Sequence, residues 1–183
     1  MERIWIDSTI HTTPPSDSER LPKEMNTYLR LQSLGISYQR LDHAATATVD
    51  DCADVEKRLD IHICKNLFLN NAKKTRFYML MMPGEKRYRA GDVSAQVQSS
   101  RLSFASAADM ERLLGITPGS VSVLALMNDK NHDVSLLIDR ELLSEEFIGC
   151  HPCVNTASLK LRMDDLLTVF LPHTGHEPRF VTL

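Results

Sequence analysis

Apolar residues recur along this chain with two different periods, and their alternation predicts the secondary structure. From Leu21 to Leu34 they follow helical spacing, and Gly35 is a natural stop for that helix. Thr48 and Asp51 have the spacing of a capping box that opens a second helix. The predicted helices cover residues 21–34, 48–59, 91–98, 106–114 and 163–171, and Pro172 is expected to end the last one.

Short apolar runs bounded by turn residues predict strands between these helices. The predicted strands cover residues 36–41, 61–69, 75–82, 101–105, 121–127, 134–138, 157–161 and 180–182. Turn-like segments join 61–69 to 75–82 and 121–127 to 134–138, so each pair is expected to form a β-hairpin. Hairpins interspersed with helices predict an α+β fold, with a single compact domain, a mixed and mostly antiparallel β-sheet and flanking helices.

The length of 183 residues suits one domain with short terminal extensions. We expect an N-terminal extension at 1–20, a core domain at 21–171 and a C-terminal tail at 172–183. With 43% hydrophobic and 25% charged residues, the composition is that of a globular protein and excludes a disordered or fibrous one.

Composition also narrows the environment and the partners. No apolar run approaches the roughly 18 residues of a membrane span, and the N-terminus lacks the basic and apolar regions of a secretory signal. Four cysteines in such a chain predict reduced thiols and a cytoplasmic protein. The net charge of −3 argues against a protein that coats polyanions, so a nucleic acid would have to be held by a local basic patch.

The most restricted polar segment is the loop 149–156, which reads Gly-Cys-His-Pro-Cys-Val-Asn-Thr. Gly149 can adopt a positive φ and lets a ligand approach the backbone, whereas Pro152 fixes its own φ and removes one donor. The N–H groups that are left are candidates for binding an oxyanion or a carbonyl oxygen. A tight turn between two strands explains the same residues without a ligand.

Lys65 lies inside the apolar run 61–69, where a charged side chain is costly unless its ammonium reaches water or an anion. An outward-facing lysine on a half-buried strand is the alternative. His43, at the end of a predicted strand, is a candidate to line a cleft. Basic residues at 73–76 and 86–89 surround one hairpin and form either a small basic zone or an ordinary solvated surface.

Cys150 and Cys153 have C-x-x-C spacing, which also occurs in redox and zinc sites. A thioredoxin-like pair opens a helix, whereas this one leads into a predicted strand. Structural zinc calls for a second close pair, and Cys52 and Cys64 lie on different predicted elements. We therefore interpret the two thiols as small residues beside a functional loop, with a metal or redox protein as the distant alternative. Neither a G-x-S-x-G elbow nor a glycine-rich phosphate loop occurs.

Several separated motifs together resemble the YbaK / prolyl-tRNA synthetase-associated editing domain family, and most closely its free-standing branch that deacylates mischarged prolyl tRNA. The resemblance spans 21–171 and rests first on K-N-L-F-L after Cys64 and on the G-x-x-P loop with its histidine. The other matching segments are R-L-S-F-A at 101–105, L-G-x-x-P-G-S-V at 114–121, Asn128-Asp129, Ile138-Asp139 and Asn155-Thr156.

This resemblance implies a hydrolase for the ester between a wrong amino acid and the 3′ end of tRNA(Pro), with no cofactor and no metal. A pocket made for proline rejects a smaller amino acid by only about 1–3 kcal/mol per missing methylene, so a second pocket must remove the error. Alanine is the favoured substrate residue, with cysteine and serine behind it. The implied partners are the tRNA acceptor end and prolyl-tRNA synthetase, no membrane is involved, and a monomer is favoured.

The family also implies roles for individual residues. Lys65 would engage the phosphate or ribose of the terminal adenosine, the N–H groups of the Gly149 loop would polarise the carbonyl, and His151 would position water. A ribose hydroxyl of the tRNA itself would assist the attack. The expected substrate-binding residues are Asn66, Cys150, Pro152, Asn155, Thr156, Ser103 and His43. The main alternative is a non-catalytic member that binds aminoacyl-tRNA or acts as a regulator.

Overall fold

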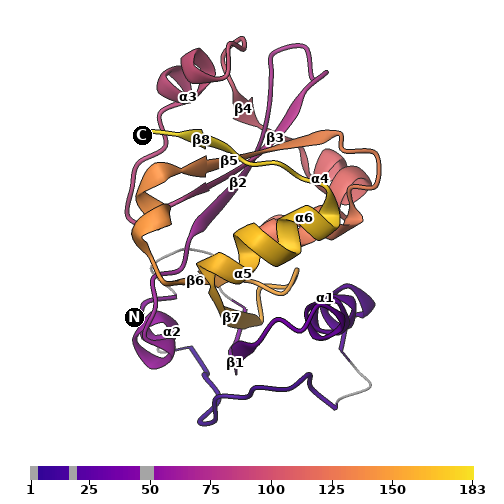
Figure 1. Cartoon of the computed structure of the whole chain (residues 1–183), viewed down its shortest axis with the longest axis vertical. Coiled ribbons are helices and arrows are strands. Elements are labelled where there is room, and N and C mark those ends of the chain that lie inside the picture. The colour runs from indigo at the N-terminus through magenta and orange to yellow at the C-terminus, as the bar shows by residue number, and fades with distance from the viewer. Residues whose placement is uncertain (1–3, 17–19, 46–51) are drawn as a thin grey trace.

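Two β-sheets organise the computed structural model of the chain, which describes residues 4–16, 20–45 and 52–183 (Figure 1). The larger sheet has the strand order β4 (Ser103–Phe104), β2 (Lys65–Asn70), β3 (Phe77–Met82), β5 (Val134–Asp139) and β8 (Arg179–Val181). The strand β2 is antiparallel to β3 and β4, whereas the pairs β3–β5 and β5–β8 are parallel. The larger sheet is therefore mixed.

The smaller sheet is antiparallel throughout. Its strand order is β1 (Tyr38–Asp42), β7 (Ala157–Arg162) and β6 (Phe147–Cys150). The N-terminal segment follows the outer edge of β1 through the bridges Ile6–His43 and His11–Arg40. A parallel bridge between Ile63 and Gly149 joins β6 to the residues just before β2. Two segments that are far apart in the sequence therefore lie side by side.

Short helices connect the strands, and α4 has a side-chain cap at its start and a glycine at its end. The α-helices are α1 (Pro22–Ser33), α2 (Ala53–Leu59), α3 (Ala90–Gln96), α4 (Ala107–Leu114), α5 (Met163–Asp165) and α6 (Leu171–Thr174). The chain also forms 3₁₀ segments η2 (Val123–Asn128) and η3 (Arg140–Ser144) and a π-helical segment η4 (Leu166–Phe170). Ser106 Oγ accepts from the N–H of Asp109 at the start of α4, and Gly115 ends that helix with a φ of 64°.

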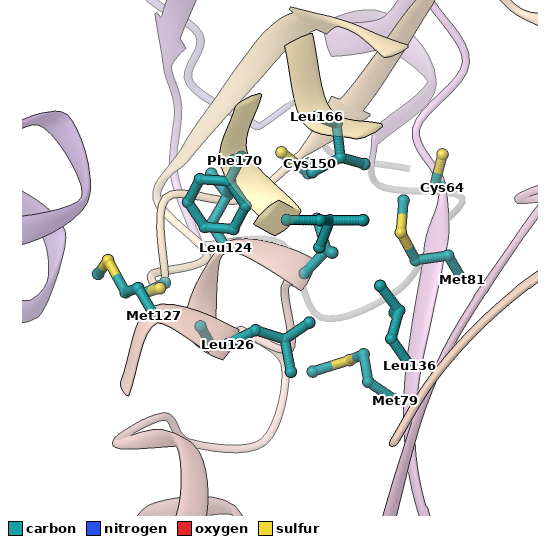
Figure 2. Close-up of a cluster of buried hydrophobic side chains, with 14 of the residues drawn as sticks. Cys64, Met79, Met81, Leu124, Leu126, Met127, Leu136, Cys150, Leu166 and Phe170 are labelled. Carbon is teal, nitrogen blue, oxygen red and sulfur yellow. The ribbon is translucent and has the colours of Figure 1, made fainter. Parts of the chain in front are cut away.

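The larger sheet carries apolar side chains on both faces. Met79 and Met81 belong to the main core together with η2 and the α5–α6 segment, as Figure 2 shows. Leu80 and Met82 project from the other face into a second cluster that contains Val93 of α3. A third cluster lies between α2 and the smaller sheet. This layering places the junction of the two sheets close to the centre of the molecule.

The predicted α+β class and the hairpin β2–β3 are confirmed. The strand predicted at 121–127 is wrong, because these residues form the 3₁₀ segment η2. Ser122 Oγ accepts from the N–H of Leu124 and starts the segment. All residues from Val123 to Met127 are buried, so the run has no polar periodicity that could distinguish a strand from a helix. Instead of a second hairpin, β5 pairs in parallel with β3.

The closing helix also extends further than predicted. It runs through Pro172 and ends at Gly175, which has a φ of 73°. Pro172 is tolerated because it sits in the first turn of α6, directly after the π-helical segment η4. The segment 172–183, expected as a tail, supplies β8 at the edge of the larger sheet. The predicted capping pair of Thr48 and Asp51 lies outside the described residues.

Within residues 4–16, 20–45 and 52–183, no helix is both long enough and apolar enough to cross a membrane.

Candidate functional site

The two main sequence motifs meet where β2 begins and β6 ends. The N–H of Cys64 donates to the carbonyl of Gly149 at 3.0 Å, and the N–H of Gly149 donates to the carbonyl of His62 at 3.1 Å. Lys65 follows Cys64 directly, and His151 follows the last residue of β6. The backbone of the K-N-L-F-L segment therefore starts beside the loop 151–156.

Gly149 has a different role from the predicted one. Its N–H is already bound to His62, and its φ is outside the left-handed region, so the expectation of an oxyanion donor with positive φ is wrong. A Cβ atom at this position would lie 2.6 Å from Ile61 Cδ1 and 2.8 Å from Ile63 Cγ1. The glycine is required because the two sheets approach closely here. The left-handed residue of the loop is Cys153, with a φ of 62°.

His151 presents a neutral imidazole to the site. Its Nδ1 lies 2.8 Å from the carbonyl oxygen of Ala157, and because a carbonyl only accepts, Nδ1 carries the proton. Burial lowers the pKa of His151 to about 4, against the hydrogen bond to Ala157. At neutral pH its Nε2 therefore carries a lone pair that can accept a proton or a hydrogen bond.

His43 supports His151 and has no ring nitrogen left for a substrate. Its Nδ1 lies 2.8 Å from the carbonyl oxygen of Ala44, and its Nε2 lies 2.9 Å from Ser158 Oγ. The rings of His43 and His151 are 6.1 Å apart between centroids. Burial lowers the pKa of His43 as well, so two uncharged rings lie next to each other. The N–H of His43 also donates to the carbonyl of Thr156, which ties the loop to β1.

Asn66 offers an unused acceptor. Its Nδ2 donates to the carbonyl of Cys64 at 3.2 Å, which fixes the orientation of the amide. Its Oδ1 is buried and has no hydrogen-bond partner within the described part of the chain. Strand alternation places Asn66 on the same face of β2 as Cys64, which is the face toward β6. A buried carbonyl oxygen without a donor is costly unless a ligand supplies one.

Lys65 projects from the other face of β2, together with Leu67 and Leu69. Its half-buried ammonium donates to the carbonyl oxygen of Lys86 at 3.1 Å, in the turn after β3. The loop and the lysine are thus adjacent through the backbone, while the ammonium lies at the end of the larger sheet. An ammonium has three donors, so the bond to Lys86 leaves donors for an anion. The catalytic role of Lys65 stays a prediction.

The thiols near the loop belong to the hydrophobic core. Cys64, Cys150 and Cys153 are buried in the main core, where Figure 2 shows Cys64 beside Met81 and Cys150 beside Leu166. Burial raises the pKa of Cys64 to about 12 and that of Cys153 to about 11, and it also raises the pKa of Cys150. Thiols held in the protonated form are poor nucleophiles, and the packing of these side chains in the core is the role that the structure shows.

Comparison with known proteins decides the family. A family model described as the aminoacyl-tRNA editing domain matches residues 43–169. The chain belongs to this family. The editing domain therefore includes His43, the start of β2 and the whole loop 149–156, and the prediction of a hydrolase of the aminoacyl-tRNA editing type is confirmed.

Curated relatives of this editing domain have related names. The prolyl-tRNA editing protein ProX of Acetoanaerobium sticklandii is 28% identical over 137 residues, which cover 75% of this chain and 84% of the relative. The prolyl-tRNA synthetase associated domain-containing protein 1 of Bos taurus is 31% identical over 153 residues, covering 81% of this chain and 88% of the relative. A crystal structure of a candidate trans-editing enzyme for prolyl-tRNA synthetase shares the fold, with a TM-score of 0.65, 17% identity and coverage of 90% and 99% of the two chains.

The remaining predicted substrate-binding residues lie in two different places. Ser103 pairs with Asn70 at the end of β2 that is remote from Lys65, and it is exposed, so the expectation that it lines the site is wrong. The resemblance implied that Ser103, in the R-L-S-F-A segment, contacts the substrate. In the structure, β4 is a two-residue edge strand in which Phe104 pairs with Leu69 and Ser103 pairs with Asn70. Pro152 is buried, and Asn155 and Thr156 are half-buried in the turn before β7.

One residue beside the loop was missed by sequence reasoning. Gly119, with a φ of 85°, lies so close to Asn155 that a Cβ on it would stand 3.4 Å from Asn155 Nδ2. The positive φ disfavours other residues here, while the contact distance itself is an ordinary one. The signal was present in the L-G-x-x-P-G-S-V segment, whose glycine follows Pro118.

One cluster of side chains that could ligate a metal lies where the N-terminal segment meets β1. In the described residues, the atoms of Asp7, His11 and Asp42 are close enough to hold an ion. Asp42 is already paired with Arg20 at 2.6 Å and with Arg40, and Asp7 pairs with His11 at 2.9 Å. Two guanidinium groups on one carboxylate disfavour a metal cation, so this cluster holds the N-terminal segment on β1.

Proposed function

We propose that this editing domain hydrolyses the aminoacyl ester of mischarged tRNA(Pro), and that alanine is the amino acid removed. The family and the names of its relatives support an aminoacyl-tRNA substrate. The single observation that carries the chemistry is the neutral His151, with Nδ1–H on Ala157 and a lone pair on Nε2. Such a nitrogen is suited to position and deprotonate water.

The substrate's ammonium group finds an acceptor in the site. A free α-ammonium donates hydrogen bonds, and the buried Oδ1 of Asn66 has no other partner within the described residues. Binding the ammonium there removes the cost of leaving this oxygen unsatisfied. Asn66 then acts as a substrate-binding residue, as the sequence predicted.

Ester hydrolysis requires no enzyme nucleophile. Water adds to the carbonyl carbon and gives a proton to His151 Nε2, and the ester C–O bond then breaks as the leaving ribose oxygen takes up a proton. A neighbouring ribose hydroxyl would assist this transfer. Since the N–H of Gly149 is occupied, the donors for the oxyanion must come from the loop after Cys150. Lys65, at the end of the sheet, would hold the terminal phosphate.

The amino acid preference follows from size. A small side chain such as a methyl group suits a site beside two uncharged imidazoles, whereas proline adds methylenes and lacks one ammonium donor. Differences of this kind are worth about 1–3 kcal/mol each, which is enough for discrimination in an editing site.

Deacylation of alanyl-, cysteinyl-, seryl- and prolyl-tRNA(Pro) by the full chain tests the proposal. We expect alanyl-tRNA(Pro) to be hydrolysed fastest and prolyl-tRNA(Pro) to be spared. The matched variants are His151→Ala, which should lose at least about a hundred-fold in kcat, and the exposed His62→Ala, which should retain the wild-type rate. Tight binding of alanyl-tRNA(Pro) with no hydrolysis would instead identify a non-catalytic binder.

A further inference from the structure

The outer face of the smaller sheet is hollowed at the end away from the loop 151–156. A cavity of about 710 Å³ lies between the N-terminal segment, the end of α1 and the strands of this sheet. Its lining includes Thr12, Gln32, Gln39, Phe147, Lys160 and Arg162, and we call these residues the basic groove.

Two cations in the basic groove share one aromatic ring. Lys160 Nζ lies 4.7 Å from the centroid of the Phe147 ring, and the guanidinium carbon of Arg162 lies 5.6 Å from it. Register explains the arrangement, since Phe147 pairs with Arg162 and Gly149 pairs with Lys160 across β6–β7. Cation–π contacts of this kind fix the cations in place without neutralising them.

The lining of the basic groove contains no carboxylate among the described residues. By contrast, the neighbouring cavity of about 380 Å³ is lined by Glu56, Glu85, Glu141 and Glu145. Arg162 pairs with Glu146 at 3.0 Å, but the two side chains are 50% and 66% exposed, so this pair is weak and a phosphate can compete with it. The groove is therefore a local positive surface on a chain with a net charge of −3.

Other basic residues are less suited to bind a polyanion near the site. Lys86 is held by Asp139 at 2.8 Å and Glu141 at 2.7 Å. The basic turn 73–76 lies at the far end of the hairpin β2–β3 from Lys65. The basic groove instead shares β6 and β7 with the loop, and Arg162 is on the order of 20 Å along β7 from the loop's last residue.

We propose that the basic groove binds the sugar–phosphate backbone of the tRNA substrate outside the ester-binding pocket. The inference rests on the proposed function, which supplies an RNA as the substrate. Phosphate contacts position an RNA without reading its sequence, and they make affinity depend on salt. The groove does not hold the ester itself, because its lining contains none of the residues of the loop 151–156.

The test compares two arginines in matched surroundings. Arg162 pairs with Glu146 over the ring of Phe147. Arg112 on α4 is 57% exposed, pairs with Asp109 at 2.8 Å and lies 5.4 Å from the ring of Phe77 on β3. We expect Arg162→Gln to weaken the binding of uncharged tRNA(Pro) about five- to ten-fold at low salt, and to reduce the slope of log K against log salt by about 0.7–0.9. Arg112→Gln should match the wild type in both measurements.

A second variant and a small substrate separate the possible outcomes. Gln39→Glu places a negative charge in the groove at an exposed position and should weaken tRNA binding as Arg162→Gln does. Both variants should hydrolyse 2′(3′)-O-alanyl-adenosine at the wild-type rate, since this substrate does not reach the groove. Unchanged tRNA affinity and salt slope in Arg162→Gln, or an equal loss in Arg112→Gln, would overturn the proposal. Failure of the wild type to hydrolyse alanyl-tRNA(Pro), with these binding differences intact, would overturn the proposed function alone.

Discussion

At the scale of single residues, His151 shows how burial sets chemistry. Its Nδ1–H is held by Ala157, and the ring is neutral because the pKa is lowered to about 4. An exposed histidine would titrate near 6.5 and would be partly charged at neutral pH. The surrounding structure thus keeps the His151 imidazole neutral, and able to act as a base, over a wider pH range than a solvent-exposed imidazole would be.

The first prediction is the acid limb of the pH profile. If the neutral Nε2 of His151 is required, kcat/KM on alanyl-tRNA(Pro) stays level from pH 7 to about 5 and falls only as the pH approaches about 4. Steady-state rates at constant ionic strength measure this limb. A midpoint near 6.5 would show that a solvent-exposed imidazole, and not His151, controls the reaction.

The same shift affects stability with a defined sign. The unfolded His151 binds a proton near pH 6.5, whereas the folded one binds it near pH 4. Between these values the unfolded state holds more protons, so the free energy of unfolding decreases as the pH falls through this window. We expect His151→Asn to show a shallower decrease of the unfolding free energy between pH 6.5 and 4 in urea titrations.

Lys65 is the second test at this scale. Lys65→Ala removes the cation proposed to hold the terminal phosphate, and charge-assisted bonds contribute about 1.5–3 kcal/mol. Misplacement of the ester by about 1 Å costs a further hundred-fold. We predict a loss of at least about a hundred-fold in kcat/KM with an unchanged circular dichroism spectrum. Lys65→Arg should recover part of the rate, since a planar fork replaces a compact ammonium.

Retention of more than about a third of the activity in Lys65→Ala would contradict this role. The lysine would then serve only to bind the carbonyl of Lys86 in the turn after β3.

At the scale of elements, β6 depends on a glycine for its approach to the residues before β2. The third prediction is that Gly149→Ala destabilises the protein by about 1–3 kcal/mol through overpacking. Its Cβ would lie 2.6 Å from Ile61 Cδ1, 2.8 Å from Ile63 Cγ1 and 3.0 Å from the Cα of Ile63. Chemical denaturation measures the loss, and a companion Ile61→Ala substitution should recover part of it. Full wild-type stability of Gly149→Ala would show that the two sheets can separate at no cost.

At the scale of the whole molecule, a buried hydrogen bond between His176 and Asp129 joins the C-terminal segment to the sheet. His176 Nε2 lies 3.1 Å from Asp129 Oδ2, both side chains are nearly inaccessible, and Asp129 also accepts from the N–H groups of Asp133 and Val134. The segment that follows His176 forms β8 along β5. The pair therefore holds the end of the chain at the start of β5.

The fourth prediction concerns this pair. His176→Ala leaves the buried Asp129 without one partner, and the loss of a buried hydrogen bond costs about 1–3 kcal/mol. Thermal unfolding should show a clear drop in Tm, while the deacylation rate below the transition stays close to wild type, since His176 is outside the site. The exposed His62→Ala serves as the control. Loss of activity without loss of stability would assign His176 a functional role.

The sequence alone was sufficient for the local features. Caps and stops such as Ser106, Gly115 and Gly35 are recognised from neighbouring residues, because their hydrogen bonds and φ angles depend on contacts within a few positions. The separated motifs were sufficient to identify the family and the class of reaction. The segment 121–127 has no polar periodicity and was wrongly predicted as a strand, since a buried apolar run satisfies a strand and a helix alike.

Only the tertiary structure decided how the motif residues are used. The contact of Gly149 with Ile61 and Ile63, the unpaired Oδ1 of Asn66 and the lowered pKa of His151 all arise between segments far apart in the chain. Burial, approach distance and hydrogen-bond partners are properties of the packed molecule, and sequence spacing does not fix them. For the same reason the charge of the chain did not reveal the basic groove, which exists because β6 and β7 bring Phe147 next to Arg162.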